Sequence, residues 1–175
     1  GSYEFTYSSI VNILGLMKGS LPENLAIPQE IRYITFTRIK DDVRQEILNS
    51  FHITGLEGLV DAIKFDDLSE LYFDNSVVPN EWYSQSTVIN RLQKRANQDS
   101  LLVQLANAVN NATPGGLIIL DSITDIATQS TVPHCWTNLA GFLRGLQRVA
   151  KQRGTTVYLL LSRGILESAQ ERELA

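Results

Sequence analysis

The sequence has little cysteine, no long apolar run and no excess of basic residues, and each lack excludes a class of protein. Cys135 is the one cysteine among 175 residues, which excludes internal disulfides and leads us to expect a reducing compartment such as the cytoplasm. No apolar run approaches the ~20 residues of a membrane-spanning helix, so we expect no membrane partner. The net charge of −4 argues against a generally basic, nucleic-acid-binding surface.

Metal ligands and catalytic thiol pairs are equally scarce. The chain has two histidines and one cysteine, too few for the usual zinc sites, which need three or four ligands. His134 and Cys135 are neighbours, and adjacent side chains on a chain usually point apart, so we expect neither a metal site nor a Cys–His catalytic pair. The length and the 43% hydrophobic content fit one globular domain over residues 1–175.

The pattern of apolar residues predicts an α/β fold with an open, mainly parallel sheet. Two continuous apolar runs, 117–121 and 156–162, are typical of strands that are covered on both faces. Between them, residues 136–152 carry apolar side chains at helical spacing, which predicts a β–α–β unit. The pattern also predicts helices at 8–18, 40–51 and 87–111, strands at 31–36 and about 62–65, and an irregular segment at 68–83.

Asp121 is the first candidate for a functional residue. It ends the apolar strand 117–121 and is followed by Ser122, and the carboxyl ends of parallel strands border the crevice where such sheets bind ligands. In phosphate-loop proteins an aspartate at this place, the Walker B residue, helps to hold Mg²⁺. The alternative is an aspartate that only caps a helix or forms a turn.

The first eight residues keep the frame of a phosphate-binding loop but not its chemistry. That loop reads Gly, four residues, Gly-Lys-Ser/Thr, and then a helix. Counting from Gly1, Thr6 stands in place of the second glycine, Tyr7 in place of the lysine, and Ser8 keeps the hydroxyl. Tyrosine carries no positive charge with which to neutralise phosphate. Alternatively, residues 3–7 are themselves the first strand and the loop is deleted; either alignment abolishes hydrolysis.

Three stretches together resemble one known family. The strand and turn LIILDSITDI, the segment WTNLAGFLRGLQRVAKQRGTTVYLLLSR and the segment IRYITFTRIKDDVRQEIL are similar to the KaiC-like branch of the RecA superfamily. The resemblance covers most of residues 31–174. It implies a RecA-like ATPase fold, here a P-loop NTPase-like core that looks truncated, of the kind that assembles into rings or filaments with nucleotide between subunits.

The resemblance also implies which site residues are kept and which are lost. The catalytic glutamates that follow the second strand of the family fall on Thr37 and Arg38, so no carboxylate remains there to activate water. Asp121 and Ser122 match the Walker B strand. The polar pair after the last strand would be Ser162-Arg163, and both Arg38 and Arg163 are candidates for a contact with phosphate or with a neighbouring subunit.

The resemblance therefore implies a non-catalytic, pseudo-ATPase member that assembles with itself or with a related RecA-like subunit, in recombination, RNA modification or signalling. Two alternatives stay open. The first is an ATPase whose true phosphate loop lies outside this sequence or is atypical, with Asp121 holding Mg²⁺ beside ATP. The second is a module that binds nucleic acid through the assembly, using a basic stripe drawn from Arg91, Lys94, Arg95, Arg144, Arg148, Lys151 and Arg153.

Two further groups of residues have a plain and a functional interpretation. The aromatic residues Tyr72, Phe73, Trp82 and Tyr83 either pack an irregular segment or form a patch at a subunit interface. The acidic residues Asp66, Asp67, Glu70 and Asp74 are either a solvated surface or a cation site.

Overall fold

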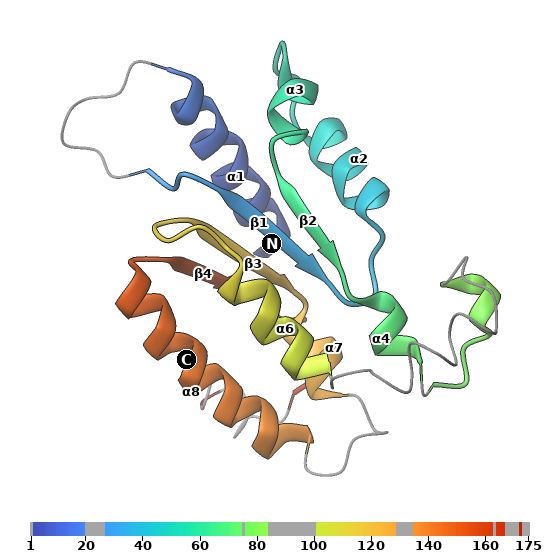
Figure 1. Ribbon diagram of the computed structural model, residues 1–175. Helices are drawn as coiled ribbons and strands as arrows, with labels where there is room; N and C mark the ends of the chain where they lie inside the picture. The colour runs from blue at the N-terminus through green and yellow to red at the C-terminus, as the bar shows by residue number, and fades with distance from the viewer. Residues whose placement is uncertain are drawn as a thin grey trace.

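The protein is described by a computed structural model that covers residues 2–19, 27–74, 76–83, 101–128, 135–162, 164–166 and 172. In these residues the protein is α/β, with helices on both faces of a four-stranded, all-parallel sheet (Figure 1). The order of the strands is β2-β1-β3-β4. The α/β class and the parallel sheet predicted from the sequence are therefore confirmed.

In the described residues, two or three helical elements separate each strand from the next. The strands are β1 (Ile31–Thr35), β2 (Lys64–Asp67), β3 (Leu117–Asp121) and β4 (Thr156–Leu159). The helices are α1 (Ser2–Lys18), α2 (Lys40–Ser50), α3 (Leu56–Val60), α4 (Ser69–Phe73), the 3-10 turn η1 (Asn80–Trp82), α6 (Leu101–Asn110), α7 (Ile123–Ala127) and α8 (Cys135–Arg153). β1, β3, β4, α2 and α8 begin within one residue of the predicted positions.

Other boundaries differ from the prediction. α1 begins at Ser2, six residues earlier than expected, because Tyr3 and Tyr7 extend its apolar face. The alternative in which residues 3–7 form a strand is therefore wrong. β2 begins two residues later than predicted, and the segment 68–83 contains the short helical elements α4 and η1. Residues 84–100 lie outside the described residues, so the part of the predicted helix 87–111 that precedes Leu101 is not described.

Two hydrophobic cores lie on the two faces of the sheet. Successive strand residues point to opposite faces, so Tyr33 and Ile119 join one core and Ile34 and Ile118 join the other. α1, α2 and α3 cover the first face, and α6, α7 and α8 cover the second (Figure 1). All five residues of β1 and all five of β3 are buried, as expected for central strands of a covered parallel sheet.

The turn that leads into β3 depends on a close approach of two backbone segments. A Cβ atom added to Gly116 would lie 2.9 Å from the carbonyl oxygen of Thr113 and 3.0 Å from that of Glu30. Both neighbours are backbone atoms, which cannot move aside as a flexible side chain does. Gly116 is therefore required where the start of β3 approaches the residue that precedes β1.

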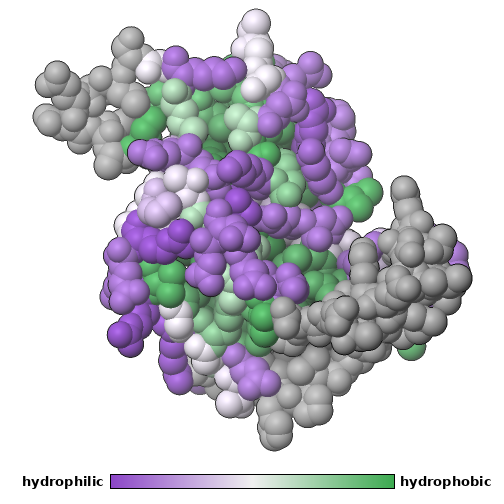
Figure 2. All heavy atoms as spheres, in the orientation of Figure 1, coloured by the Kyte–Doolittle hydropathy of each residue, from purple (hydrophilic) through white to green (hydrophobic). Residues whose placement is uncertain are grey.

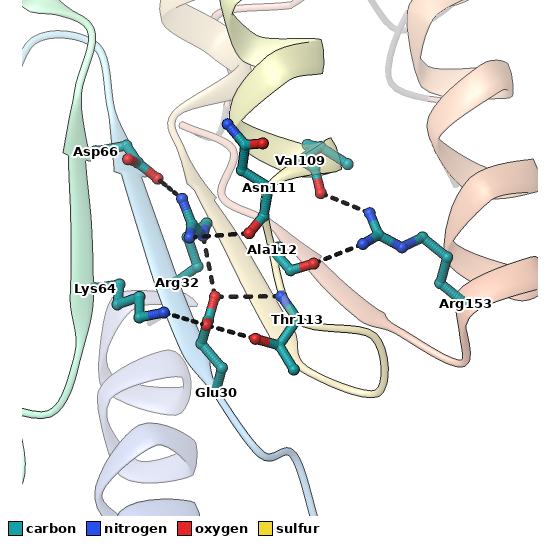
Figure 3. A network of polar contacts seen from close by, with 9 residues as sticks. All are labelled: Glu30, Arg32, Lys64, Asp66, Val109, Asn111, Ala112, Thr113 and Arg153. Carbon is teal, nitrogen blue, oxygen red and sulfur yellow. Dashed lines mark hydrogen bonds and ion pairs between the residues drawn. The ribbon is translucent and has the colours of Figure 1, made fainter.

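A network of charged side chains lies at the amino end of the sheet (Figure 3). The carboxylate of Glu30 accepts hydrogen bonds from Lys64 at 2.6 Å, from the hydroxyl of Thr113 at 2.7 Å and from Arg32 at 3.1 Å. Arg32 also pairs with Asp66 at 2.7 Å. We call Glu30, Arg32, Lys64, Asp66 and Thr113 the Glu30 network; it ties β1, β2 and the turn before β3 together.

Arg153 provides a separate link at the same end of the molecule. Its guanidinium donates to the carbonyl oxygens of Val109 at 3.0 Å and Ala112 at 2.7 Å (Figure 3). The carbonyl of Val109 lies in the last turn of α6 and also accepts the backbone N–H of Ala112, whereas the carbonyl of Ala112 lies just beyond the helix, where no further turn supplies a donor. One charged side chain thus fastens the last turn of α8 to the last turn of α6.

Replacing Arg153 with alanine should lower the free energy of unfolding by about 2 kcal/mol, because two hydrogen bonds from a charged donor are lost. Arg148 provides the matched control, since it is an exposed arginine on the same helix, and Arg148→Ala should change stability by no more than about 0.5 kcal/mol. Urea denaturation of both variants measures the difference. Equal effects would mean that Arg153 does not act as a cap.

Candidate functional site

Asp121 lies at the carboxyl end of β3, and both of its carboxylate oxygens are bound by other side chains. The hydroxyl of Tyr3 donates to Oδ1 at 2.8 Å. The hydroxyl of Tyr33 donates to Oδ2 at 2.7 Å, and the guanidinium of Arg38 reaches the same oxygen at 3.2 Å. The side chain of Asp121 is only 1% exposed, so its charge is stabilised by protein groups and not by water.

Arg38 connects this carboxylate to a second one. Its guanidinium pairs with Glu46 at 2.6 Å and donates to the hydroxyl of Tyr7 at 2.9 Å, and Tyr7 in turn donates to Glu46 at 2.9 Å. The guanidinium carbon also lies 5.3 Å from the centre of the Tyr3 ring, within the range of a cation–π contact. We call Tyr3, Tyr7, Tyr33, Arg38, Glu46 and Asp121 the Asp121 cluster.

Five places in the chain supply the Asp121 cluster: α1, β1, the turn after β1, α2 with Glu46, and β3. Tyr3 and Tyr7 are four residues apart on α1 and therefore share one face of that helix. Tyr33 points from β1 toward the same face of the sheet, and Arg38 follows the end of β1. Because β1 and β3 are adjacent and parallel, with Thr35 opposite Asp121, the residues after β1 come directly beside this carboxylate.

Burial and charge keep the tyrosines and the arginine of the Asp121 cluster in one protonation state. Burial and the nearby Asp121 carboxylate raise the pKa of Tyr33 far above its usual range, and the same two causes raise the pKa of Tyr3. Burial would lower the pKa of Arg38, but its hydrogen bonds to Tyr7 and Glu46 outweigh that effect and raise it. The tyrosines therefore stay neutral donors and the arginine stays charged at any physiological pH.

The structure brings only some of the predicted site residues together. Asp121 and Arg38 form an ion pair, and Tyr7 accepts a hydrogen bond from Arg38. Ser122 is the N-cap of α7 and exchanges capping hydrogen bonds with Asp125, so here it has a structural role. Arg163 lies outside the described residues, and its neighbour Ser162 donates its backbone N–H to the hydroxyl of Thr124.

The alignment of a phosphate-binding Gly-Lys-Ser/Thr motif with Thr6, Tyr7 and Ser8 does not fit the position of these residues in α1. α1 begins at Ser2, so these residues lie in its second turn, whereas a Gly-Lys-Ser/Thr motif opens its helix. Thr6 is 2% exposed and Tyr7 is 3% exposed, which leaves neither side chain at the surface.

Sequence reasoning missed Tyr3, Tyr33 and Glu46. A signal exists for the two helical tyrosines, since Tyr3 and Tyr7 repeat at the i, i+4 spacing of one helix face. Tyr33 gives none, because an aromatic residue inside a strand is ordinary. Glu46 looks like any acid on the outer face of an amphipathic helix.

The other candidate groups have separate places in the fold. Asp66 pairs with Arg32, and Asp67 accepts the backbone N–H of Ser69. In the aromatic group Phe73 contacts both Tyr72 and Tyr83, with ring centres 5.0 and 5.4 Å apart, whereas Trp82 is 79% exposed. In the basic stripe Arg144, Arg148 and Lys151 are exposed on α8 and Arg153 caps α6; Arg91, Lys94 and Arg95 lie outside the described residues.

Comparisons with protein-family models, with curated proteins and with solved structures found no match. Among the described residues, no group of three or more His, Cys, Asp or Glu side chains is placed to hold a metal ion. No helix in that part of the chain combines the length and the apolar content that crossing a membrane requires. We therefore argue the function from the Asp121 cluster and the surfaces around it.

Proposed function

We propose that this chain is a non-catalytic, RecA-like domain that serves as a scaffold or regulatory subunit and assembles with itself or with a related subunit. The observation that carries the proposal is that other side chains of the protein already bind both carboxylate oxygens of Asp121. Its oxygens accept hydrogen bonds from Tyr3 and Tyr33 and an ion pair from Arg38. A carboxylate that serves Mg²⁺ must present an oxygen to the ion or to one of its waters.

The position of Tyr3 supports the same conclusion. In a phosphate-binding loop the Ser/Thr hydroxyl at the helix start and the strand-end aspartate both serve the Mg²⁺ of the nucleotide. Here the hydroxyl of Tyr3, on α1, donates directly to the strand-end aspartate Asp121. The guanidinium of Arg38 supplies positive charge beside Asp121, as a bound cation would. The protein's own side chains thus occupy the place where an ATPase holds its metal.

The parallel sheet is compatible with a RecA-like core, and the helices that cover its two faces form outer surfaces of the described part of the chain. A subunit whose strand-end acid is bound internally gains nothing from nucleotide, so its use lies in these surfaces. Assembly is therefore the function that the geometry supports best.

Calorimetric titration with Mg²⁺ and ATP tests this proposal. We expect no heat of binding up to millimolar nucleotide, in wild-type protein and in Asp121→Asn alike, because Asp121 is already bound by Tyr3, Tyr33 and Arg38. Circular dichroism before and after titration confirms that each sample is folded. Binding that weakens in Asp121→Asn, or any release of phosphate that depends on Asp121, would overturn the proposal and favour an ATPase.

A further inference from the structure

The charges of this chain are separated between the two edges of the sheet. Residues 40–83, which form α2, α3, β2, α4 and η1, contain ten carboxylates and three cationic side chains. Residues 126–166, which include α8 and β4, contain five cationic side chains and no carboxylate. Because β2 and β4 are the outer strands in the order β2-β1-β3-β4, the acidic and basic segments lie at opposite edges (Figure 1).

The basic edge contains a groove of about 500 Å³ between α8 and β4. Its apolar lining includes Leu143, Leu146, Val157 and Leu159, and its polar lining includes Gln147 and Lys151. Lys151 is exposed. In the orientation of Figure 2, hydrophobic residues lie between polar ones over the part of the surface where α6 and α8 run. A groove of this size, apolar inside and cationic at its border, fits a bulky apolar side chain that is flanked by carboxylates.

The acidic edge carries such a side chain. Trp82 is 79% exposed and Val77 is fully exposed. Both lie on the segment 76–83, which follows α4. Glu81, next to Trp82, is also exposed. Exposed tryptophan is costly in water and is enriched at the centres of protein interfaces. The segment therefore offers an apolar anchor with a carboxylate beside it.

We propose that residues 76–83 of one copy dock into the α8–β4 groove of a second copy, with Trp82 against the apolar lining and Glu81 near Lys151. The segment and the groove are at opposite edges of the sheet, so the contact joins two molecules head to tail. A head-to-tail contact between identical chains closes into a ring or extends as a filament. The inference rests on the proposed function, because it names the surfaces through which the non-catalytic subunit assembles.

Sedimentation velocity over a range of concentrations tests the contact with two single variants. Glu81→Lys places two cations together at the contact, and Lys151→Glu places two carboxylates together. Each variant alone should therefore associate at least tenfold more weakly than the wild-type protein. An equimolar mixture of the two variants should recover association, because every contact between unlike variants again pairs a cation with a carboxylate. Recovery in the mixture is specific to a contact between these two surfaces on different copies.

Two further variants complete the test. Trp82→Ala should weaken association by about thirtyfold or more, as expected for a central tryptophan anchor. Glu57→Lys is the control, since Glu57 is an exposed acid on α3 outside the segment, and it should leave association within about threefold of wild type.

A wild-type protein that remains monomeric at high concentration would overturn the docking contact. So would association that is unchanged by Glu81→Lys, Lys151→Glu and Trp82→Ala. Neither result depends on Asp121, so the nucleotide titration distinguishes a failure of this contact from a failure of the proposed function.

Discussion

Replacing Arg38 with methionine should lower the free energy of unfolding by about 3 kcal/mol. The substitution removes the only cation in contact with Asp121 among the described residues and leaves a carboxylate that is 1% exposed. Removal of one partner from a buried ion pair is strongly destabilising because the remaining charge stays desolvated. Methionine keeps much of the volume of the arginine stem, so a cavity contributes little. Urea denaturation followed by circular dichroism measures the change.

The pair formed by Arg44 and Asp61 provides the matched control. Its N–O distance is 3.1 Å, close to the 3.2 Å between Arg38 and Asp121, but the carboxylate of Asp61 is 61% exposed. Arg44→Met should therefore cost less than about 1 kcal/mol. Combining Arg38→Met with Asp121→Asn should recover part of the lost stability, because the buried charge is then removed. If the two arginine variants lose equal stability, Asp121 does not depend on Arg38.

Much of the fold could be predicted because its signals are local. The run Leu117–Asp121 is apolar at every position but the last, which is typical of a strand covered on both faces, and the structure places it at the centre of the sheet. The helix at Cys135–Arg153 follows from its apolar spacing and from Gly154, which ends it with a φ of 62°. The start of α1 was harder to predict because an apolar face built from tyrosines resembles a strand as much as a helix.

Three members of the candidate site could be predicted from the sequence. Asp121 ends one strand and Arg38 follows its parallel neighbour, whereas Tyr7 was named for another reason, as the residue in place of a phosphate-loop lysine. The partners of Asp121 depend on tertiary packing. Tyr3 reaches it from 118 residues away and Tyr33 from 88 residues away, and no spacing in the sequence encodes those distances. The sequence pointed to a lost phosphate site over Thr6, Tyr7 and Ser8. The structure instead shows that Tyr3, on α1, is one of two tyrosines that bind Asp121.

Glu30 makes the amino end of the sheet sensitive to acid. Burial alone would raise the pKa of its carboxyl group, but hydrogen bonds from Lys64, Thr113 and Arg32 outweigh burial and lower that pKa to about 2. The pKa in the unfolded chain is about 4.5. Since the folded state holds this proton more weakly, Glu30 stabilises the fold fully above about pH 4.5, and the contribution is lost as the pH falls toward 2. A shift of this size corresponds to at most about 3 kcal/mol.

Replacing Glu30 with glutamine should therefore destabilise the protein by about 2 to 3 kcal/mol at pH 7 and by progressively less at pH 4, 3 and 2. Glutamine keeps the shape and the capacity to accept from Thr113, but it removes the charge that attracts Lys64 and Arg32. Urea midpoints of the wild-type protein and of the variant at each pH measure the difference between them. Glu57→Gln, which changes an exposed acid outside the network, should leave the midpoint nearly unchanged throughout. A difference for Glu30→Gln that stays constant from pH 7 to pH 2 would mean that the carboxylate charge does not hold this end of the sheet together.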